Sequence, residues 1–323
     1  MARVAVQLTN FTGGELSPRL DGRNDLAKYA SGCSTLENLV VYPHGSAARR
    51  PGTNFVAEVK DSTKKTRLIP FEFSTTQTYM LEFGNQYIRF YKDNGQILSG
   101  GSAYEISTPY LEAELFDLKF AQSADVMYIC HPNHEVEKLS RTGHTSWSLT
   151  DVDFTNGPYL DTNISTTTLN PGSHTVGTGV ALVASAVTGI NNGSGFVSTD
   201  VGRLVRFRDG YGKITGVTDT TNATITIIKD LGSATASTDW SLGAFSDTTG
   251  HPSCVTFFEQ RLVFAATLNN PQTVYFSKSG DYENMDANIG GTIADDDSII
   301  YTIASNQVNA IRFMTATRTL IIG

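Results

Sequence analysis

The chain has 323 residues, enough for two or three domains, and 40% of them are hydrophobic, which suffices for a sizeable buried core. Only 17% are charged and the net charge is −8, so the composition argues against a protein that holds nucleic acid through phosphate contacts. The three cysteines, Cys33, Cys130 and Cys254, include no CxxC pair, which suggests neither a disulfide framework nor a zinc site, and they are predicted to be free thiols. The most apolar stretch, 179–187, is too short to span a bilayer.

Residues 1–60 are predicted to form an extended interface segment. Gly13 and Gly14 allow a sharp, open backbone, and Pro18 holds the chain extended. Charges of alternating sign follow, and a later Arg-Arg-Pro-Gly turn presents two guanidinium groups. These residues either cap the first strand, latch onto a neighbouring subunit or adaptor, or contact phosphate. The candidate interface residues are Arg19, Asp21, Arg23, Asp25, Arg49 and Arg50.

Residues 61–156 carry the period-two pattern of β-strands, with β-branched and aromatic residues between turn formers. Clear examples are 78–83 and 87–91, on either side of a Gly-Asn turn. Helical periodicity is scarce, and only 24–32 and 111–116 are predicted as short helices. The sequence therefore predicts an all-β chain with few short helices.

A weak repeat runs through the chain: an aromatic residue, a short polar loop and then three apolar residues. It predicts an antiparallel hairpin whose first strand points an aromatic side chain inward and whose second strand is buried on both faces. The four copies pair 71–73 with 79–81, 118–120 with 126–129, 255–258 with 262–264, and 311–313 with 320–322.

The spacing of these copies predicts a partial β-propeller with an inserted domain. Met80 and Met127 are 47 residues apart, about one four-stranded blade. Met127 and Val263 are 136 residues apart, which leaves an excess of about 89 residues. We assign this excess to 157–246, a stretch rich in Thr, Ser, Gly and Asn, as a small inserted β-sandwich or barrel. Blades are then expected in 61–156 and 247–323.

The last residues, 319–323, have the pattern of the middle of a hairpin. A chain that stops inside a blade leaves an unpaired strand edge. The sequence is therefore expected either to be part of a longer protein or to be completed by another chain, with the last blade incomplete.

Two stretches carry a resemblance to a known family. The first contains Asn10-Phe-Thr-Gly-Gly-Glu-Leu-Ser-Pro18, then 21–26, Tyr29, 36–39 and Arg49-Arg-Pro-Gly-Thr53. The second runs through 240–245, 250–253, 257–262, 270–277 and 279–284. In order and spacing they resemble the tail nozzle proteins (tail tubular protein B) of podovirus-type phages. Those proteins open with a Gly-Gly-x-x-x-Pro element, an Arg/Asp/Leu/Tyr stretch and an Arg-Pro-Gly turn.

The resemblance, which covers about a third of the chain, implies a homohexameric ring at the distal end of a phage tail. Such a ring is part of the virion and is assembled in the host bacterial cytoplasm. It would join the adaptor below the portal, dock tail fibre proteins, and line the channel through which genomic DNA passes without sequence-specific binding. The resemblance implies a structural protein that is no enzyme, uses no cofactor and is not stably inserted in a membrane.

No catalytic residue and no metal site is predicted. His131 and His134 have the HxxH spacing of metal ligands, but Pro132 between them favours a turn after a strand. The run Asp295-Asp296-Asp297 lacks the spaced ligands of a calcium site and is predicted as a solvated loop. The sequence contains no HExxH, GxSxG or Walker pattern.

Two alternatives to a structural tail protein stay open. A host-glycan-binding tail adhesin would bind through 157–246, with Tyr159, Tyr211 or Trp240 as an exposed aromatic platform, although Trp147 and Trp240 are more often core residues. A virion-associated glycan hydrolase would need two carboxylates across a groove, and the sequence nominates no such pair.

Overall fold

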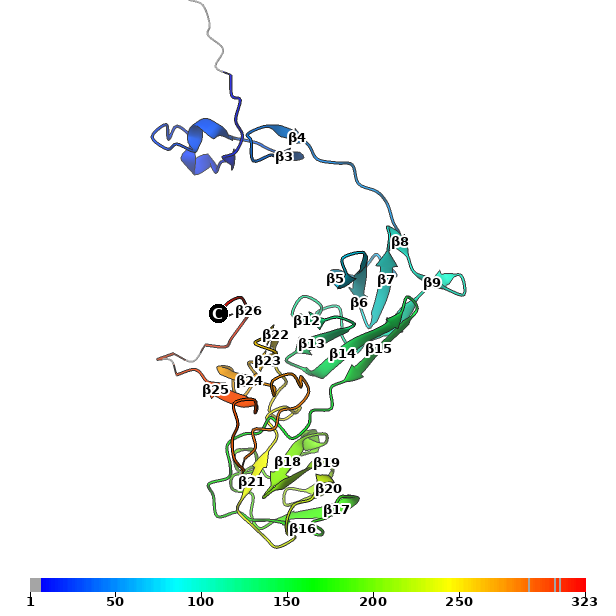
Figure 1. The fold of residues 1–323 in the computed structure, drawn as a ribbon, viewed down its shortest axis with the longest axis vertical. Coiled ribbons are helices and arrows are strands. Elements are labelled where there is room, and N and C mark those ends of the chain that lie inside the picture. The colour runs from blue at the N-terminus through cyan, green and yellow to red at the C-terminus, as the bar shows by residue number, and fades with distance from the viewer. Residues whose placement is uncertain (1–6, 290, 305, 308) are drawn as a thin grey trace, which may run out of the picture. The chain divides into compact units, whose positions relative to one another are not determined.

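The computed structural model describes residues 7–289, 291–304, 306–307 and 309–323. It divides into two compact units, one that ends at Val56 and one that spans Ala57–Gly323. The described residues contain no α-helix and only four 3-10 helices: η1 (Pro18–Leu20), η2 (Tyr29–Ser31), η3 (Asn191–Gly193) and η4 (Ser198–Asp200). Strands supply the rest of the regular structure, so the predicted all-β class is confirmed (Figure 1).

The two helices predicted from the sequence are not formed. Residues 24–32 contain η2 and turns, and residues 112–117 form consecutive turns. Nucleating a helix is costly, and segments of about ten residues recover little of that cost unless tertiary packing holds them. The prediction was wrong because helix-forming residue types alone do not supply that packing.

The first unit contains two small strand pairs. β1 (Gly14–Glu15) pairs in parallel with β2 (Gly32–Cys33), and β3 (Leu39–Val41) forms a hairpin with β4 (Ala47–Arg49). A Cβ atom on Gly13 would lie 2.8 Å from the carbonyl oxygen of Lys28 and 2.9 Å from that of Ser31. The close approach of these two stretches therefore requires glycine at the first position of the Gly-Gly element.

The second unit begins with two antiparallel sheets. The first has the order β11-β7-β6-β5, with β8 beside β7, and the second has the order β12-β13-β14-β15. The strands of the first sheet are β5 (Arg67–Ser74), β6 (Gln77–Gly84), β7 (Tyr87–Lys92), β8 (Gly95–Gln96) and β11 (Glu105–Ser107), and a separate ribbon consists of β9 (Leu98–Ser99) and β10 (Ser102–Ala103). The strands of the second sheet are β12 (Lys119–Ser123), β13 (Val126–His131), β14 (His134–Gly143) and β15 (Ser146–Asp151).

One hydrophobic core joins these two sheets. In β5, Ile69 and Phe71 are buried while Leu68 and Pro70 are exposed, as the alternation of a half-buried strand requires. Trp147 of β15 stacks on Phe90 of β7, with 4.4 Å between the ring centroids. The prediction that Trp147 is a core residue is confirmed.

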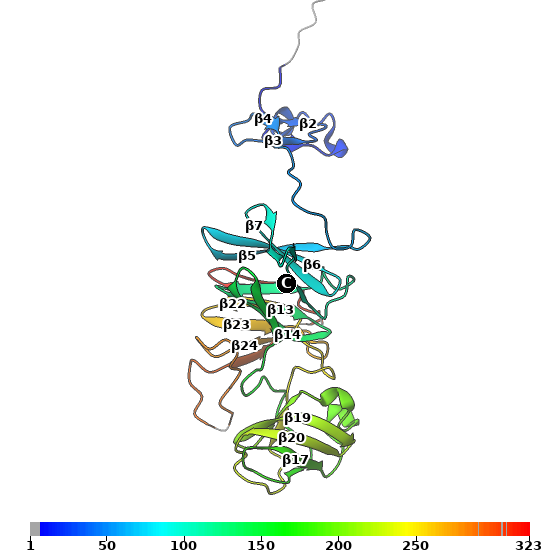
Figure 2. The same ribbon diagram turned by 90° about the vertical axis from the view of Figure 1, so that its right-hand side faces the viewer.

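A third antiparallel sheet follows later in the chain, with the order β22-β23-β24-β25. Its strands are β22 (Cys254–Phe258), β23 (Arg261–Ala265), β24 (Thr273–Phe276) and β25 (Ile299–Thr302), and a hairpin of β26 (Met314–Ala316) and β27 (Leu320–Ile322) follows it. Tyr128 of β13 and Phe264 of β23 share one core cluster, which joins the second sheet to the third. The three sheets therefore succeed one another in space in chain order (Figure 2).

The predicted repeat corresponds to four hairpins: β5/β6, β12/β13, β22/β23 and β26/β27. The second strand of the middle two copies is buried along nearly its whole length, as predicted. In the fourth copy the first strand begins at Met314, after the predicted 311–313, and β27 has no buried residue. Burial on both faces is therefore wrong for that copy, because no described part of the chain encloses it. It is also wrong for the first copy, in which Met80 of β6 is exposed.

A six-stranded antiparallel sheet lies in sequence between the second and third sheets, with the order β16-β17-β20-β19-β18-β21. Its strands are β16 (Leu169–Pro171), β17 (Gly177–Ala184), β18 (Leu204–Phe207), β19 (Gly210–Asp219), β20 (Asn222–Lys229) and β21 (Trp240–Leu242). Leu169 at one edge exchanges two backbone hydrogen bonds of 3.0 Å with Ser237, which precedes the strand at the other edge. We call it the curled sheet. Because it is one sheet and not two, the sandwich alternative of the prediction is not formed, and the half-barrel form is nearer to the barrel alternative.

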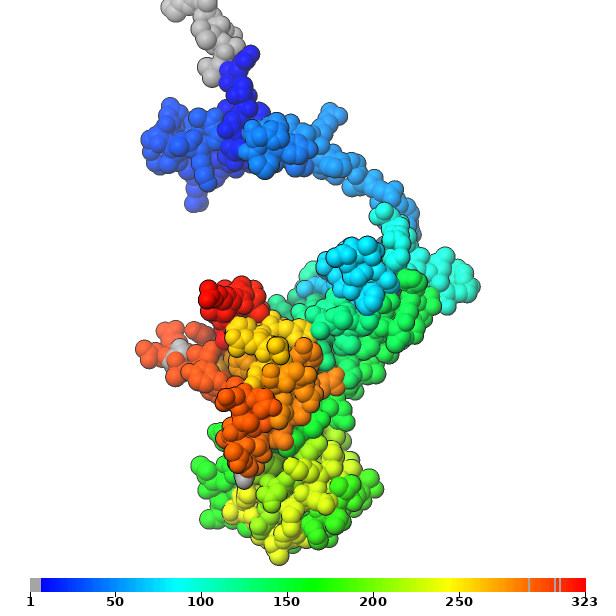
Figure 3. Space-filling model, in the orientation of Figure 1, coloured from blue at the N-terminus to red at the C-terminus, as the bar shows by residue number. Residues whose placement is uncertain are grey.

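The curled sheet has its own hydrophobic core and appears as a separate lobe, green to yellow, in Figure 3. The segments that lead into and out of it are paired: Tyr159 forms an antiparallel bridge with Gly243, and the N–H of Leu160 donates to the carbonyl of Leu242 at 2.9 Å. The flanking segments therefore lie side by side.

The three cysteines are free thiols, as predicted. Burial raises the pKa of Cys130 and of Cys254. Within the described part of the chain, no helix has the length and apolar character needed to cross a membrane.

Candidate functional site

Residues 7–56, which we call the N-terminal segment, form short strands, turns and 3-10 helices but have no hydrophobic core. Their only buried residues are Gly32 and Gly45, and none of their apolar side chains is buried. The large hydrophobic side chains that this segment exposes are Leu8, Leu26, Leu39, Val40, Tyr42, Phe55 and Val56. Sequence reasoning missed this feature, because a sequence shows which residues are apolar but not whether the fold covers them.

The predicted interface residues all lie on this segment, and the structure does not gather them into one cluster of mutual contacts. Arg23 and Asp25 pair with each other, through Nε to Oδ1 at 2.8 Å and Nη2 to Oδ2 at 2.6 Å. This contact lowers the pKa of Asp25, although both side chains are exposed. Arg50 donates through Nε to Oδ1 of Asn38 at 2.7 Å.

The other three predicted interface residues are exposed in or beside short elements. Arg19 lies in η1, Asp21 follows it directly, and Arg49 ends β4. Single exposed charges of this kind add little to stability, but they can select a partner by complementary charge. The N-terminal segment therefore exposes both charged and apolar side chains.

A second candidate site lies in the other unit, between the curled sheet and the third sheet. It is a cleft of about 680 Å³. Six side-chain amides contribute to its lining, and we call it the amide cleft: Asn163, Asn191, Asn192, Asn269, Asn270 and Gln272. Amides both donate and accept hydrogen bonds, and the lining also includes Asp161 and Arg203, so such a cleft suits a polar ligand.

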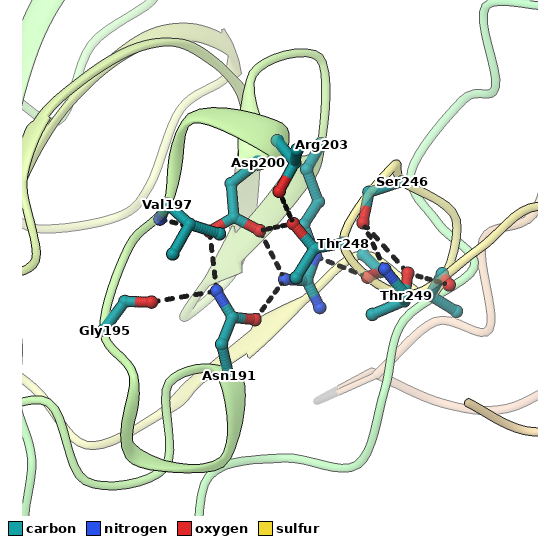
Figure 4. A network of polar contacts seen from close by, with 11 residues as sticks. Asn191, Gly195, Val197, Asp200, Arg203, Ser246, Thr248 and Thr249 are labelled. Atoms are coloured by element: carbon teal, nitrogen blue, oxygen red, sulfur yellow. Dashed lines mark hydrogen bonds and ion pairs between the residues drawn. The ribbon is translucent and has the colours of Figure 1, made fainter. Parts of the chain in front are cut away.

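A buried polar network supports one wall of the amide cleft (Figure 4). The carboxylate of Asp200, at the end of η4, accepts hydrogen bonds from four groups. The donors are Nδ2 of Asn191 at 2.6 Å, the N–H of Val197 at 3.0 Å, Nη1 of Arg203 at 2.8 Å and Oγ1 of Thr248 at 2.8 Å. Thr248 lies in the segment that follows the curled sheet in the chain, which we call the return segment. The network therefore fixes the return segment to the curled sheet.

Arg203 has the largest fully buried side chain of the network, and only 1% of the residue is exposed. Its Nε donates to the carbonyl of Gly243 at 2.8 Å and its Nη1 also reaches Oδ1 of Asn191 at 2.7 Å. Burial lowers the pKa of Arg203, and the neighbouring Asp200 opposes that effect. Its buried Nη2 has no hydrogen-bond partner among the described residues, so the guanidinium is held but not fully satisfied.

The predicted aromatic platform is not exposed. Tyr159, Tyr211 and Trp240 are all buried, and the indole N–H of Trp240 donates to the carbonyl of Thr167 at 3.0 Å. That expectation is therefore wrong, while the core assignment of Trp240 is confirmed. These side chains face the interior because they stand on strands and bridges whose inner face needs large apolar groups.

The acidic run near residue 296 is a solvated loop only in part. Asp295 and Asp296 are exposed, as predicted. Asp297 is buried; its carboxylate accepts from Nζ of Lys278 at 2.7 Å and from the N–H of Ala294 at 2.8 Å. The ammonium of Lys278 lowers the pKa of Asp297, so this carboxylate is an internal ion-pair partner.

No family model and no curated protein matches the chain. The resemblance to nozzle proteins therefore rests on the motifs themselves. In the structure these motifs lie in the N-terminal segment and in the stretch from β21 through β24 to residue 284.

Proposed function

We propose that this chain is a structural subunit of a phage tail nozzle, which assembles with copies of itself into a ring through its N-terminal segment. The observation that carries the proposal is that this segment is ordered but has no core of its own. Fixing the backbone costs about 1–2 kcal/mol per residue, and burial of apolar surface is the main term that offsets it. The missing burial must come from another surface.

A neighbouring copy of the chain is the occupant that we favour. In a closed ring each subunit gives one surface and receives another, so a segment without a core can pack on the next subunit and be stabilised there. The exposed edge strand β25 offers a second contact of this kind, since Ile299, Ile300 and Tyr301 are all exposed on it.

The sheets of the second unit support the finer part of the proposal, a partial propeller. The second and third sheets are four-stranded antiparallel meanders, the form of a propeller blade, and they are joined through shared cores. The curled sheet, with its own core and paired flanking segments, is then the inserted domain of 157–246. In this proposal the ring continues the DNA channel below the adaptor, and tail fibres dock on its outer surface.

The test is the mass and shape of the purified full chain. Light scattering after size exclusion should give a multiple of 34.9 kDa, and negative-stain images should show rings. The double variant Leu39→Ser/Phe55→Ser removes two exposed apolar side chains from the N-terminal segment and should shift the protein towards the monomer.

A matched control comes from the second unit. Ile164 is fully exposed, at 100% of its surface, and Ile164→Ser should leave the assembly unchanged. A monodisperse monomer for the unaltered chain, without rings at any concentration tested, would contradict the proposal.

The amide cleft favours a second candidate function, a host-glycan-binding tail adhesin. The amides of Asn163 and Asn191 form hydrogen bonds inside the protein, and the remaining four amides of the lining can pair with the hydroxyl groups of a glycan. A glycan array probed with the full chain tests it: saturable binding that Asn192→Ala or Asn269→Ala weakens would favour the adhesin, and an array without signal would exclude it for the glycans presented.

A further inference from the structure

Two histidines and a glutamate converge at one end of the hairpin between β13 and β14. β13 ends at His131 and β14 begins at His134, and these two residues face each other in the strand register. Residues opposite each other in an antiparallel pair point to the same face, so the hairpin brings the two rings together. Their centroids are 5.2 Å apart.

Glu114 completes the group from a different part of the chain, the run of turns before β12. Its Oε2 lies 3.0 Å from Nε2 of His134 and also accepts from the N–H of Leu111 at 2.9 Å. One ligand atom from each of Glu114, His131 and His134 lies within 4.8 Å of the other two. The turn segment and the β13/β14 hairpin thus bring together three side chains of the kinds that bind metal ions.

The surroundings restrict the mobility of these side chains. Tyr110 packs edge-on against the ring of His134, with 5.2 Å between centroids and an interplanar angle of 88°. His131 is 3% exposed, and the register shift between Ile129 and His131 marks an irregularity of the kind that re-aims a side chain. His134 and Glu114 are partly exposed, so the cluster is open to solvent on one side.

We propose that Glu114, His131 and His134 bind a divalent transition-metal ion, with Zn²⁺ as the best fit, and that the ion ties the turn segment 111–117 to the β13/β14 hairpin. Two imidazoles and one carboxylate suit zinc and its neighbours, whereas calcium and magnesium require oxygen ligands. Three protein ligands leave the fourth tetrahedral position to water on the open side.

Loading the site requires small movements. Ligand atoms of a tetrahedral zinc site lie about 3.3 Å apart, given Zn–N distances of about 2.0–2.1 Å, so the cluster must contract. The N–H of Asn133 donates to Nδ1 of His131 at 3.2 Å. An ion on Nε2 leaves the ring proton on Nδ1 and displaces this hydrogen bond, so we expect weaker affinity than that of a rigid structural site.

The experiment uses the full chain, stripped with EDTA and titrated calorimetrically with Zn²⁺ alone. We expect one ion per chain, a rise in Tm with Zn²⁺ and none with Mg²⁺, and Co²⁺ visible bands of tetrahedral coordination. Glu114→Gln and His134→Ala should each weaken Zn²⁺ binding by at least about tenfold. Both positions are partly exposed, so both variants should fold, as far-UV circular dichroism will check.

The matched control is His174→Ala, which removes an exposed histidine outside the cluster and should leave the Zn²⁺ affinity unchanged. Absence of stoichiometric zinc binding by the unaltered chain overturns the proposal. So does zinc binding that survives both Glu114→Gln and His134→Ala unchanged, because the ion would then be held elsewhere.

Discussion

The buried ion pair of Asp200 and Arg203 offers the sharpest test of what stabilises the curled sheet. The two side chains have no exposed surface, and Oδ1 and Nη1 are 2.8 Å apart. Arg203→Met keeps an unbranched apolar stem but leaves the carboxylate of Asp200 buried without its counter-charge. Removal of one partner from a buried pair costs about 3–5 kcal/mol, because the remaining charge is not solvated.

The structure gives reasons to expect a cost of this size and a partial rescue. Asp200 retains three other donors after the change, which limits the loss, while the carbonyl of Gly243 and Oδ1 of Asn191 each lose a charged donor, which adds to it. The double variant Arg203→Met/Asp200→Asn removes the uncompensated charge. It should therefore be more stable than Arg203→Met alone by about 1–2 kcal/mol.

The assay is urea unfolding followed by the fluorescence of Trp240, which lies in the core of the curled sheet. A Trp147→Phe background removes the signal of the other tryptophan, which lies in a different core. The control is Lys213→Met, which breaks an exposed ion pair of 3.2 Å with Asp153 and should cost less than about 1 kcal/mol. If Arg203→Met costs no more than this control, the reasoning about charge burial is refuted.

Three further predictions concern buried groups of the first three sheets. Burial raises the pKa of Glu137 to about 7, so the folded state keeps a proton that the unfolded chain releases above its ordinary pKa of 4.5. The free energy of unfolding should therefore fall by up to about 3 kcal/mol as the pH rises from 4.5 to 7. The Glu137→Gln variant should lack this decline when both proteins are treated with EDTA and unfolded with urea across the same pH range. Arg261 donates to three backbone carbonyls at 2.6–2.7 Å, a fork that lysine cannot reproduce, so Arg261→Lys should lose about 2–3 kcal/mol in the same titration. Leu81→Ala opens a cavity at a fully buried position and should lose about 2–5 kcal/mol, measured as a lowered Tm and unfolding enthalpy in calorimetry.

The strands were the most predictable part of the fold. The segment 78–83 lies inside β6 and 87–91 inside β7, because alternation of side chains across a pleated strand is a local property of the sequence. The closure of the curled sheet is not local. It depends on a bridge between Leu169 and Ser237, which are far apart in the chain, and no periodicity marks such a pairing.

The candidate sites were less predictable than the strands. Charge alternation nominated Arg23 and Asp25, which pair with each other, whereas the larger feature of the N-terminal segment is exposed apolar surface. The sequence did not distinguish Asp200 and Arg203 from any exposed pair with the same spacing. Their role depends on η3, η4 and the return segment meeting around them, and that is a property of tertiary structure.

The histidine pair shows how a motif depends on the element that carries it. On a helix, the spacing of His131 and His134 would place both rings on one face, and Pro132 argues against a helix there. In a two-residue hairpin the same spacing makes the two residues register partners, which also places them on one face. Pro132 therefore prevents a helix from placing the two histidines on one face, but it is compatible with a hairpin that does so. A third ligand is what then separates a chance pair from a candidate site, and here Glu114 supplies it from a segment that the sequence predicted as a short helix and the structure shows as turns.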